Sequence, residues 1–431
     1  MMNRRRFTQY IGAGALGFAL PKIGWGDDGG APVVPGNTGA NGRVVVVGGG
    51  MAGATAAKYL RLWGGTGVQV TLIERDPQYY TCIMSNLVLN GSRSLSNQTF
   101  TLTRLAQRYG VNVVRGEASS IDPISQKVRT LDGREFPYDK VIVAPGVDFA
   151  TIPGLESPEA QAAVPHAWKA GPQTIALRDQ IQAMPAGGVF VLTIPLPPFR
   201  ATAGPYDRAC VVADFLRVNK PGSKVIILDA NADVLAEKTT FTRAFTVNYP
   251  DIIEYHKGVT LNSIDASTRT LNTSIGSITA NVINAIPPQR AGRIIQDTGL
   301  NNANGGRYAG VDVVTYQSTA AANIHVLGDS ASTTQPKGGH VGNAQAKVCA
   351  DAITRMLRGD LPDPDPVTNS TVFSPVSADR ASWLSVVFKY DGLSRTMTPV
   401  GGAATEAGNA TRENFDTMRG WFRNLMGDTF A

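Results

Sequence analysis

The segment that decides the fold reads Arg43-Val-Val-Val-Val-Gly-Gly-Gly-Met-Ala-Gly-Ala-Thr-Ala-Ala-Lys-Tyr-Leu60. Its four valines form a run that is apolar on both faces, which is typical of a buried parallel strand. Gly48, Gly50 and Gly53 follow with the spacing Gly-x-Gly-x-x-Gly, which allows a tight turn, close approach to a pyrophosphate and close helix packing. We therefore predict a strand, a glycine turn and a helix over residues 52–62 whose N-terminus faces phosphate groups.

A second apolar strand, residues 68–73, ends in Glu74 and Arg75. A carboxylate at this position is placed to accept hydrogen bonds from a ribose diol. A glycine triplet alone is weak evidence, because an ordinary strand-to-helix turn is the alternative. Here the order of features is more specific: a strand, the glycines, a helix, a second strand and an acid at its end. This order predicts a dinucleotide-binding unit.

Two later features favour FAD over NAD as the dinucleotide, and a third would act on the flavin ring. Residues 138–146 predict a strand that ends in a turn of small residues. Residues 324–329 predict another strand, and its terminal Gly328-Asp329 can bring a carboxylate to the ribityl chain of a flavin. Gly339 then lies at the start of a helix whose N-terminus would stabilise negative charge on the flavin ring. An ordinary strand end is the alternative for each of the two strand features taken alone.

A second αβ unit is expected after residue 146. Residues 188–195 predict a buried strand, but the residues after it are Pro195-Leu-Pro-Pro-Phe-Arg200 instead of glycines. Proline supplies no N–H donor and restricts the backbone, so the usual phosphate cradle cannot form. We predict a Rossmann-like second domain that does not bind NAD.

Composition and the N-terminus suggest an exported globular protein. The 431 residues predict two or three domains, and 43% hydrophobic residues supply ample cores. The net charge is +6, but the sequence has no basic patch interleaved with aromatic residues, so we expect no nucleic-acid partner.

Residues 3–7, Asn-Arg-Arg-Arg-Phe, precede a short apolar stretch and predict a twin-arginine signal over residues 1–28, with a linker over 29–41. A cytosolic basic tail is the alternative. We expect a periplasmic protein without stable membrane insertion.

Cysteine and histidine usage argues against metal chemistry. The three cysteines, Cys82, Cys210 and Cys349, are too few for a disulfide framework or an iron–sulfur site. They allow one disulfide with one thiol left over, or three free thiols. The four histidines are isolated in sequence and lack metal-ligand spacing, so we expect no metal site.

Beyond these motifs, the chain resembles the flavoprotein subunit of flavocytochrome c sulfide dehydrogenase, a relative of sulfide:quinone oxidoreductases and disulfide reductases. The resemblance covers residues 42–431, and several matching segments lie outside the generic nucleotide fold. The matching segments are Val44–Gly50, Tyr79–Cys82, Pro165–Gly171, Pro198–Arg200, Gly204–Tyr206, Ile286–Gly292 and Asp428–Phe430.

The resemblance implies an α/β fold like that of glutathione reductase, with two Rossmann-like nucleotide-binding domains and a smaller C-terminal domain. The FAD-binding domain would comprise residues 42–149 and 290–358, the second domain 150–289, and the C-terminal domain 359–431. The resemblance also implies a thioether between Cys82 and the 8α-methyl of FAD, the alternative being an inert buried thiol. A c-type cytochrome would be the partner subunit.

The chain departs from this family at its redox centre. The family's two redox cysteines correspond to Ala201 and Val372, which cannot carry a persulfide. Cys210 and Cys349 could replace the pair, but we predict two buried structural thiols instead. The other candidates for catalysis are Asp207, Lys337 and His340, the alternative for His340 being a solvent-exposed side chain. Asp207 matches an acidic residue near the family's active centre and could act as a base, a helical surface acid being the alternative. Lys337 lies at the mouth of the last predicted helix of the FAD domain.

The sequence thus predicts a periplasmic FAD-dependent oxidoreductase that takes two electrons from sulfide or another small reduced donor and passes them singly to a c-type cytochrome. One alternative is a non-catalytic flavoprotein that supports a cytochrome. Another is an NAD(P)H-dependent flavin reductase, which the prolines after residue 194 disfavour.

Overall fold

The computed structural model of the chain describes residues 33–401 and 404–431. The predicted signal segment, residues 1–28, lies outside the described residues. The described part of the predicted linker packs against the first αβ unit: Val33 N donates to Arg108 O (2.9 Å) and Thr38 Oγ1 to Gly64 O (2.8 Å).

An eight-stranded sheet contains five consecutive parallel strands, from β21 to the edge strand β5. In spatial order the strands are β22 Ala331–Ser332, β19 Ala309–Asp312, β20 Gln317–Ser318, β21 Ile324–Val326, β9 Lys140–Val143, β1 Gly42–Val47, β2 Val68–Glu74 and β5 Asn112–Arg115. Along β1, Val44 and Val46 belong to one hydrophobic core, and Val45 and Val47 belong to another. This explains why the strand is apolar on both faces.

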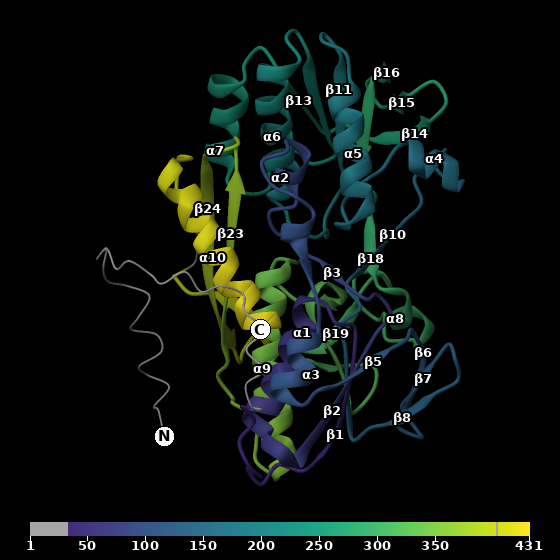
Figure 1. Cartoon of the computed structure of the whole chain (residues 1–431), viewed down its shortest axis with the longest axis vertical. Coiled ribbons are helices and arrows are strands. Elements are labelled where there is room, and N and C mark those ends of the chain that lie inside the picture. The colour runs from purple at the N-terminus through teal and green to yellow at the C-terminus, as the bar shows by residue number, and fades with distance from the viewer. Residues whose placement is uncertain (1–32, 402–403) are drawn as a thin grey trace. The chain divides into compact units, whose positions relative to one another are not determined.

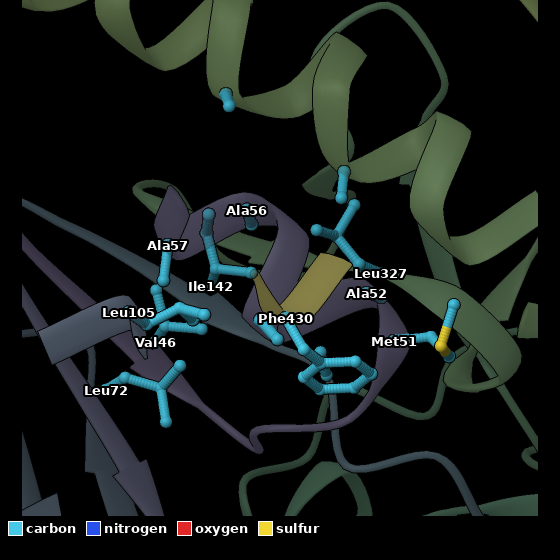
Figure 2. Packing of buried hydrophobic residues seen from close by; sticks show 14 of the residues in the cluster. Val46, Met51, Ala52, Ala56, Ala57, Leu72, Leu105, Ile142, Leu327 and Phe430 are labelled. Carbon is cyan, nitrogen blue, oxygen red and sulfur yellow. The ribbon is translucent and has the colours of Figure 1, made fainter. Parts of the chain in front are cut away.

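Four helices cover one face of this sheet, namely α1 Met51–Gly64, α3 Thr103–Tyr109, α9 Gly339–Arg358 and α10 Arg412–Phe430. Figure 1 shows α10 ending beside α1. Figure 2 shows the core beneath them, where Val46 and Leu72 of the sheet lie near Ala57 of α1 and Leu105 of α3. The small side chains of α1 let it approach the sheet closely.

The opposite face packs against a smaller layer. This layer contains helix α8 Arg293–Asp297 and the antiparallel strands β6 Ala118–Asp122, β7 Lys127–Thr130 and β8 Glu135–Pro137. The last two strands form a hairpin around Asp132-Gly133. Its turn glycine has a φ of +84°, which non-glycine residues rarely adopt.

A second, four-stranded parallel sheet lies in the middle of the chain. Its spatial order is β13 Ile253–Lys257, β12 Lys224–Asp229, β11 Val189–Ile194 and β17 Val282–Ala285. Around it lie α4 Pro158–Ala163, α5 Pro172–Ala183, α6 Gly204–Asn219, α7 Lys238–Arg243, the π-helix η5 Ala244–Asn248 and the antiparallel strands β14 Leu261–Asp265, β15 Thr270–Thr273 and β16 Gly276–Thr279.

The chain crosses between the two sheets along paired strands, β10 Val147–Phe149 and antiparallel β18 Gln289–Ala291. After α9, the strands β23 Val367–Pro375, β24 Ala381–Asp391, β25 Thr396–Pro399 and β26 Thr405–Glu406 form an antiparallel sheet that leads into α10. The remaining short elements are η3 Gly65–Gly67, β3 Tyr79–Tyr80, α2 Asn86–Leu89, η4 Ser96–Gln98, β4 Thr99–Phe100 and η6 Gly328–Ser330. The result is a mixed α/β structure.

Candidate functional site

The glycine turn after β1 has a shape that only glycine allows. Gly48 has a φ of +98°, and a Cβ there would lie 2.4 Å from Ala144 O. A Cβ on Gly53 would lie 1.8 Å from Gly48 O, below any real contact. Helix α1 starts after Gly50, and among the described residues no side chain caps its first N–H groups. These N–H groups and the positive end of the helix dipole are therefore available to a phosphate.

Glu74 lies beside this turn, as its position at the end of β2 predicts. Its Oε2 accepts a hydrogen bond from Gly49 N (2.5 Å), and its Oε1 accepts one from Asp76 N (2.8 Å). Arg75 makes half-exposed ion pairs with Asp76 (3.5 Å) and Glu117 (3.3 Å). Glu74 is thus held at the glycine turn, whereas Arg75 is engaged with acidic neighbours.

The N-termini of α1 and α9 meet at the same edge of the sheet. A Cβ on Gly339 would lie 3.1 Å from Met51 Cγ, and one on Gly342 would lie 3.4 Å from Ala52 Cβ. Helix α9 starts after Gly338, and in the described part of the chain no side chain caps it. Two positive helix ends therefore converge, an arrangement that suits an anionic or electron-rich ligand.

Asp329 carries a buried oxygen that the protein leaves unpaired. No donor among the described residues reaches Asp329 Oδ1, while its Oδ2 lies 3.7 Å from Arg200 Nη1. Buried polar atoms are nearly always hydrogen-bonded, so this oxygen requires a partner. A ribityl hydroxyl of FAD would supply one. With the glycine turn and the two helix N-termini, the residues present fit FAD.

Lys337 lies close to this carboxylate but is engaged by the backbone. Its Nζ donates to Asp329 O (2.9 Å) and Ala331 O (2.7 Å), and it lies 3.9 Å from the centre of the Tyr308 ring. Burial lowers the pKa of Lys337 to about 8. The ammonium therefore braces the Gly328–Ser330 turn, and its role in catalysis stays a prediction.

Cys82 and Arg200 meet at one backbone oxygen. The Cys82 Sγ lies 3.7 Å from Trp168 O, and Arg200 Nη2 donates to the same oxygen. Burial lowers the pKa of Arg200, but the acidic groups of Cys82 and Asp329 raise it by more. Sequence reasoning did not single out Arg200 as a site residue, although its Pro-Phe-Arg segment carries part of the family resemblance.

Asp207 is deeply buried, not on a helical surface. Asn86 Nδ2 donates to Asp207 Oδ1, and burial raises the pKa of Asp207 well above its usual value. Arg208 beside it donates to Asn86 Oδ1 (2.8 Å) and Asn284 Oδ1 (2.8 Å). The carboxyl thus belongs to a polar network that joins α2, α6 and β17, and its role as a base stays a prediction.

No sulfur pair faces this site. All three cysteines are free, and Cys210 and Cys349 are buried in different hydrophobic cores, which confirms them as two structural thiols. Ala201 has a φ of +58°, and its N–H donates to Lys337 O (2.9 Å). Val372 lies on β23 opposite Leu384. Nothing at either position can form a persulfide.

The last residues of α10 tie together the two helices that start at the site. Asp428 Oδ1 accepts from Tyr59 OH (2.5 Å), and its Oδ2 accepts from Asn343 Nδ2 (2.8 Å) and Lys347 Nζ (2.8 Å). Phe430 packs against Tyr79, with ring centres 5.3 Å apart. Only the resemblance drew attention to this segment, since a terminal Asp-Thr-Phe has no motif meaning by itself.

A cavity of about 450 Å³ lies elsewhere, between the segment after Cys82 and the first turns of α10. Its lining includes Met84, Arg93, Asp379, Arg412, Phe415 and Arg419. None of the predicted cofactor residues lines it, so it is separate from the glycine turn.

Within residues 33–401 and 404–431, no three acidic, histidine or cysteine side chains gather to hold a metal ion. No described helix combines the length and apolarity that a membrane span requires.

Comparisons with known proteins agree with the geometry of the site. The family model "Sulfide dehydrogenase [flavocytochrome c] flavoprotein chain, central" matches residues 174–287, and the model "Pyridine nucleotide-disulphide oxidoreductase" matches residues 42–173. The flavocytochrome c sulfide dehydrogenase flavoprotein chain of Chlorobaculum thiosulfatiphilum is 52% identical over 46 residues, which cover 11% of this chain and 94% of that one.

More distant relatives extend over most of the chain. The mitochondrial sulfide:quinone oxidoreductase of Dictyostelium discoideum is 21% identical over 323 residues, covering 71% of this chain and 69% of that one. The crystal structure of the sulfide:quinone oxidoreductase of Aquifex aeolicus superposes with a TM-score of 0.71 at 17% identity, covering 90% of this chain and 92% of that one. The chain therefore belongs to the family of flavocytochrome c sulfide dehydrogenase flavoprotein chains, within the pyridine nucleotide-disulphide oxidoreductases, and is an FAD-dependent oxidoreductase.

Proposed function

We propose that this enzyme is the flavin subunit of a periplasmic flavocytochrome c, which oxidises sulfide or another small reduced donor and passes the electrons to a c-type cytochrome subunit. The proposal that the enzyme binds a flavin rests on the unpaired, buried Asp329 Oδ1, which lies near the N-termini of α1 and α9. The twin-arginine motif at residues 3–7 supports export, and the name of the Chlorobaculum relative supports a cytochrome partner.

FAD supplies the step from two-electron oxidation to one-electron transfer. The protein would hold its pyrophosphate at the glycine turn, a ribose at Glu74 and its ribityl chain at Asp329. The positive start of α9, with Gly339 in its first turn, would favour negative charge on the ring. Because Ala201 and Val372 replace the family's cysteines, the donor would have to react with the flavin directly.

The middle domain is proposed as a Rossmann-like unit without NAD. At the end of β12, where such a domain places the acid that binds a ribose, Asp229 is fully buried. Its Oδ2 accepts from Tyr206 OH (2.7 Å) and Tyr255 OH (2.9 Å), and its Oδ1 accepts from Asn231. Protein donors therefore already occupy the acceptor positions that a ribose would need.

We also propose a thioether between Cys82 and the 8α-methyl of FAD. Cys82 is half-buried, follows β3 in sequence and lies close to Arg200, which contacts Asp329. Denaturing gel electrophoresis tests this bond, because covalent flavin stays fluorescent on the polypeptide. A Cys82→Ser protein that keeps the fluorescent band would rule the thioether out.

The overall proposal is tested by anaerobic titration of the purified protein with sulfide and other small reduced donors. We expect the visible flavin absorption to bleach, and oxidised c-type cytochrome to restore it. If no donor bleaches the flavin, the reading as a non-catalytic flavoprotein partner is favoured instead. Rapid bleaching by NADH would favour an NAD(P)H-dependent reductase.

A further inference from the structure

The thiol of Cys82 lies in a small cluster with a guanidinium whose role has not yet been assigned. The cluster consists of Cys82, the backbone oxygen of Trp168 and the guanidinium of Arg200. The thiol sulfur lies 3.7 Å from Trp168 O, and the guanidinium donates to that same oxygen. The sulfur and a fixed positive charge are thus neighbours, although 118 positions in sequence separate them (82 and 200).

Arg200 is held firmly in this place. Its backbone N donates to Gln289 Oε1 (2.9 Å), and its carbonyl accepts from Trp168 Nε1 (3.1 Å). Its side chain is only 15% exposed and lies 3.7 Å from Asp329 Oδ2. Solvent therefore screens its charge weakly, so the charge acts strongly on adjacent groups.

A second cation nearby, Arg208, donates its hydrogen bonds to other groups. The guanidinium of Arg208 donates to Asn86, to Asn284 and to the backbone oxygens of His166 and Ala167. It therefore stabilises the 166–168 loop that presents Trp168 O. Arg200 is the cation that shares a hydrogen-bond acceptor with the Cys82 thiol.

We propose that Arg200 is the positioning residue for covalent flavin attachment, because it fixes the backbone oxygen of Trp168, which in turn holds the Cys82 sulfur toward the 8α-methyl of FAD. This inference rests on the thioether in the proposed function. Trp168 O and the Arg200 guanidinium together fix the direction in which the sulfur approaches.

Covalent attachment leaves the flavin reduced by two electrons, so an oxidant such as a c-type cytochrome is needed to return it to the oxidised state. A proton leaves the thiol and another leaves the methyl carbon, the sulfur bonds to that carbon, and the flavin gains two electrons and two protons. Two oxidised c-type cytochromes then remove the two electrons one at a time, and the protons return to water. In a test tube, ferricyanide can serve as the one-electron oxidant.

The test measures the first-order rate of covalent attachment when the full-length apoprotein is mixed with saturating FAD and ferricyanide. Intact mass and in-gel flavin fluorescence report the covalent fraction, and fluorescence quenching reports non-covalent binding. We expect Arg200→Gln to slow attachment at least tenfold while non-covalent FAD affinity changes less than threefold. Arg200→Lys should keep more of the rate than Arg200→Gln, and the surface variant Arg293→Gln should match wild type.

Attachment by Arg200→Gln at the wild-type rate would overturn the inference and leave the thioether standing. A wild-type protein without any covalent flavin would instead remove the thioether, and the inference with it. If Arg200→Gln binds FAD poorly, the comparison moves to Arg200→Ala with and without millimolar guanidinium. Rescue of the attachment rate by guanidinium supports the inference, and its absence contradicts it.

Discussion

Substitution of Gly53 by alanine should damage both folding and FAD binding. The new Cβ would lie 1.8 Å from the backbone oxygen of Gly48, and real Cβ contacts do not fall below 3.0 Å. Because the clashing atom is backbone within the glycine turn, relief requires α1 and β1 to separate. Overpacking of this kind costs about 1–3 kcal/mol, so we expect a net loss of about 2 kcal/mol in the free energy of unfolding.

Gly420 in α10 provides a matched control for this substitution. A Cβ there meets only a flexible arginine terminus at 3.9 Å. Alanine is better than glycine in a helix by about 1 kcal/mol, so Gly420→Ala should be neutral or stabilising. Urea unfolding measures stability, and fluorescence quenching measures FAD affinity, which should fall at least tenfold for Gly53→Ala alone. Equal stability and equal FAD affinity in the two variants would refute the argument.

Three further predictions concern other buried polar groups. Burial raises the pKa of Glu237 to about 7, above its value in the unfolded chain. The free energy of unfolding of the wild type should therefore fall by up to about 3 kcal/mol as the pH rises from 4.5 to 7. Urea unfolding at several pH values should show that Glu237→Gln lacks this pH dependence. Lys58→Met should destabilise the protein by about 2–3 kcal/mol, because Nζ donates to three carbonyl oxygens at the end of α10; an unchanged urea midpoint would contradict this. Asp329→Asn should weaken FAD binding about tenfold in equilibrium dialysis, whereas exposed Asp297→Asn should not; equal affinities would count against a ribityl contact.

Local patterns predicted the first nucleotide-binding unit well. The expected strand, glycine turn, helix and second strand correspond to β1, Gly48–Gly53, α1 and β2. Glu74 and Asp329 also lie near the ends of the strands where they were expected. These predictions depend on hydrophobic periodicity and on glycine conformations, both of which are properties of a few consecutive residues.

Side-chain environments could not be predicted in the same way. Asp207 was predicted as a candidate base, with a helical surface acid as the alternative, and the structure buries it beneath α2, where it pairs with Asn86. Lys337 was placed correctly near the start of α9, but its ammonium is engaged by two backbone oxygens. Residue type shows what a group can do, whereas burial and partners come from distant parts of the chain.

By itself, the sequence predicted a dinucleotide-binding turn after the first strand, and its resemblance to the family predicted that Ala201 and Val372 stand in place of the two redox cysteines. Only the tertiary structure decided that Arg200 lies beside Cys82 and that Asp428 joins α1 to α9. The physical reason is distance along the chain. A strand and its glycine turn are specified by neighbouring residues, but a charge beside a thiol requires two segments that only the folded core brings together.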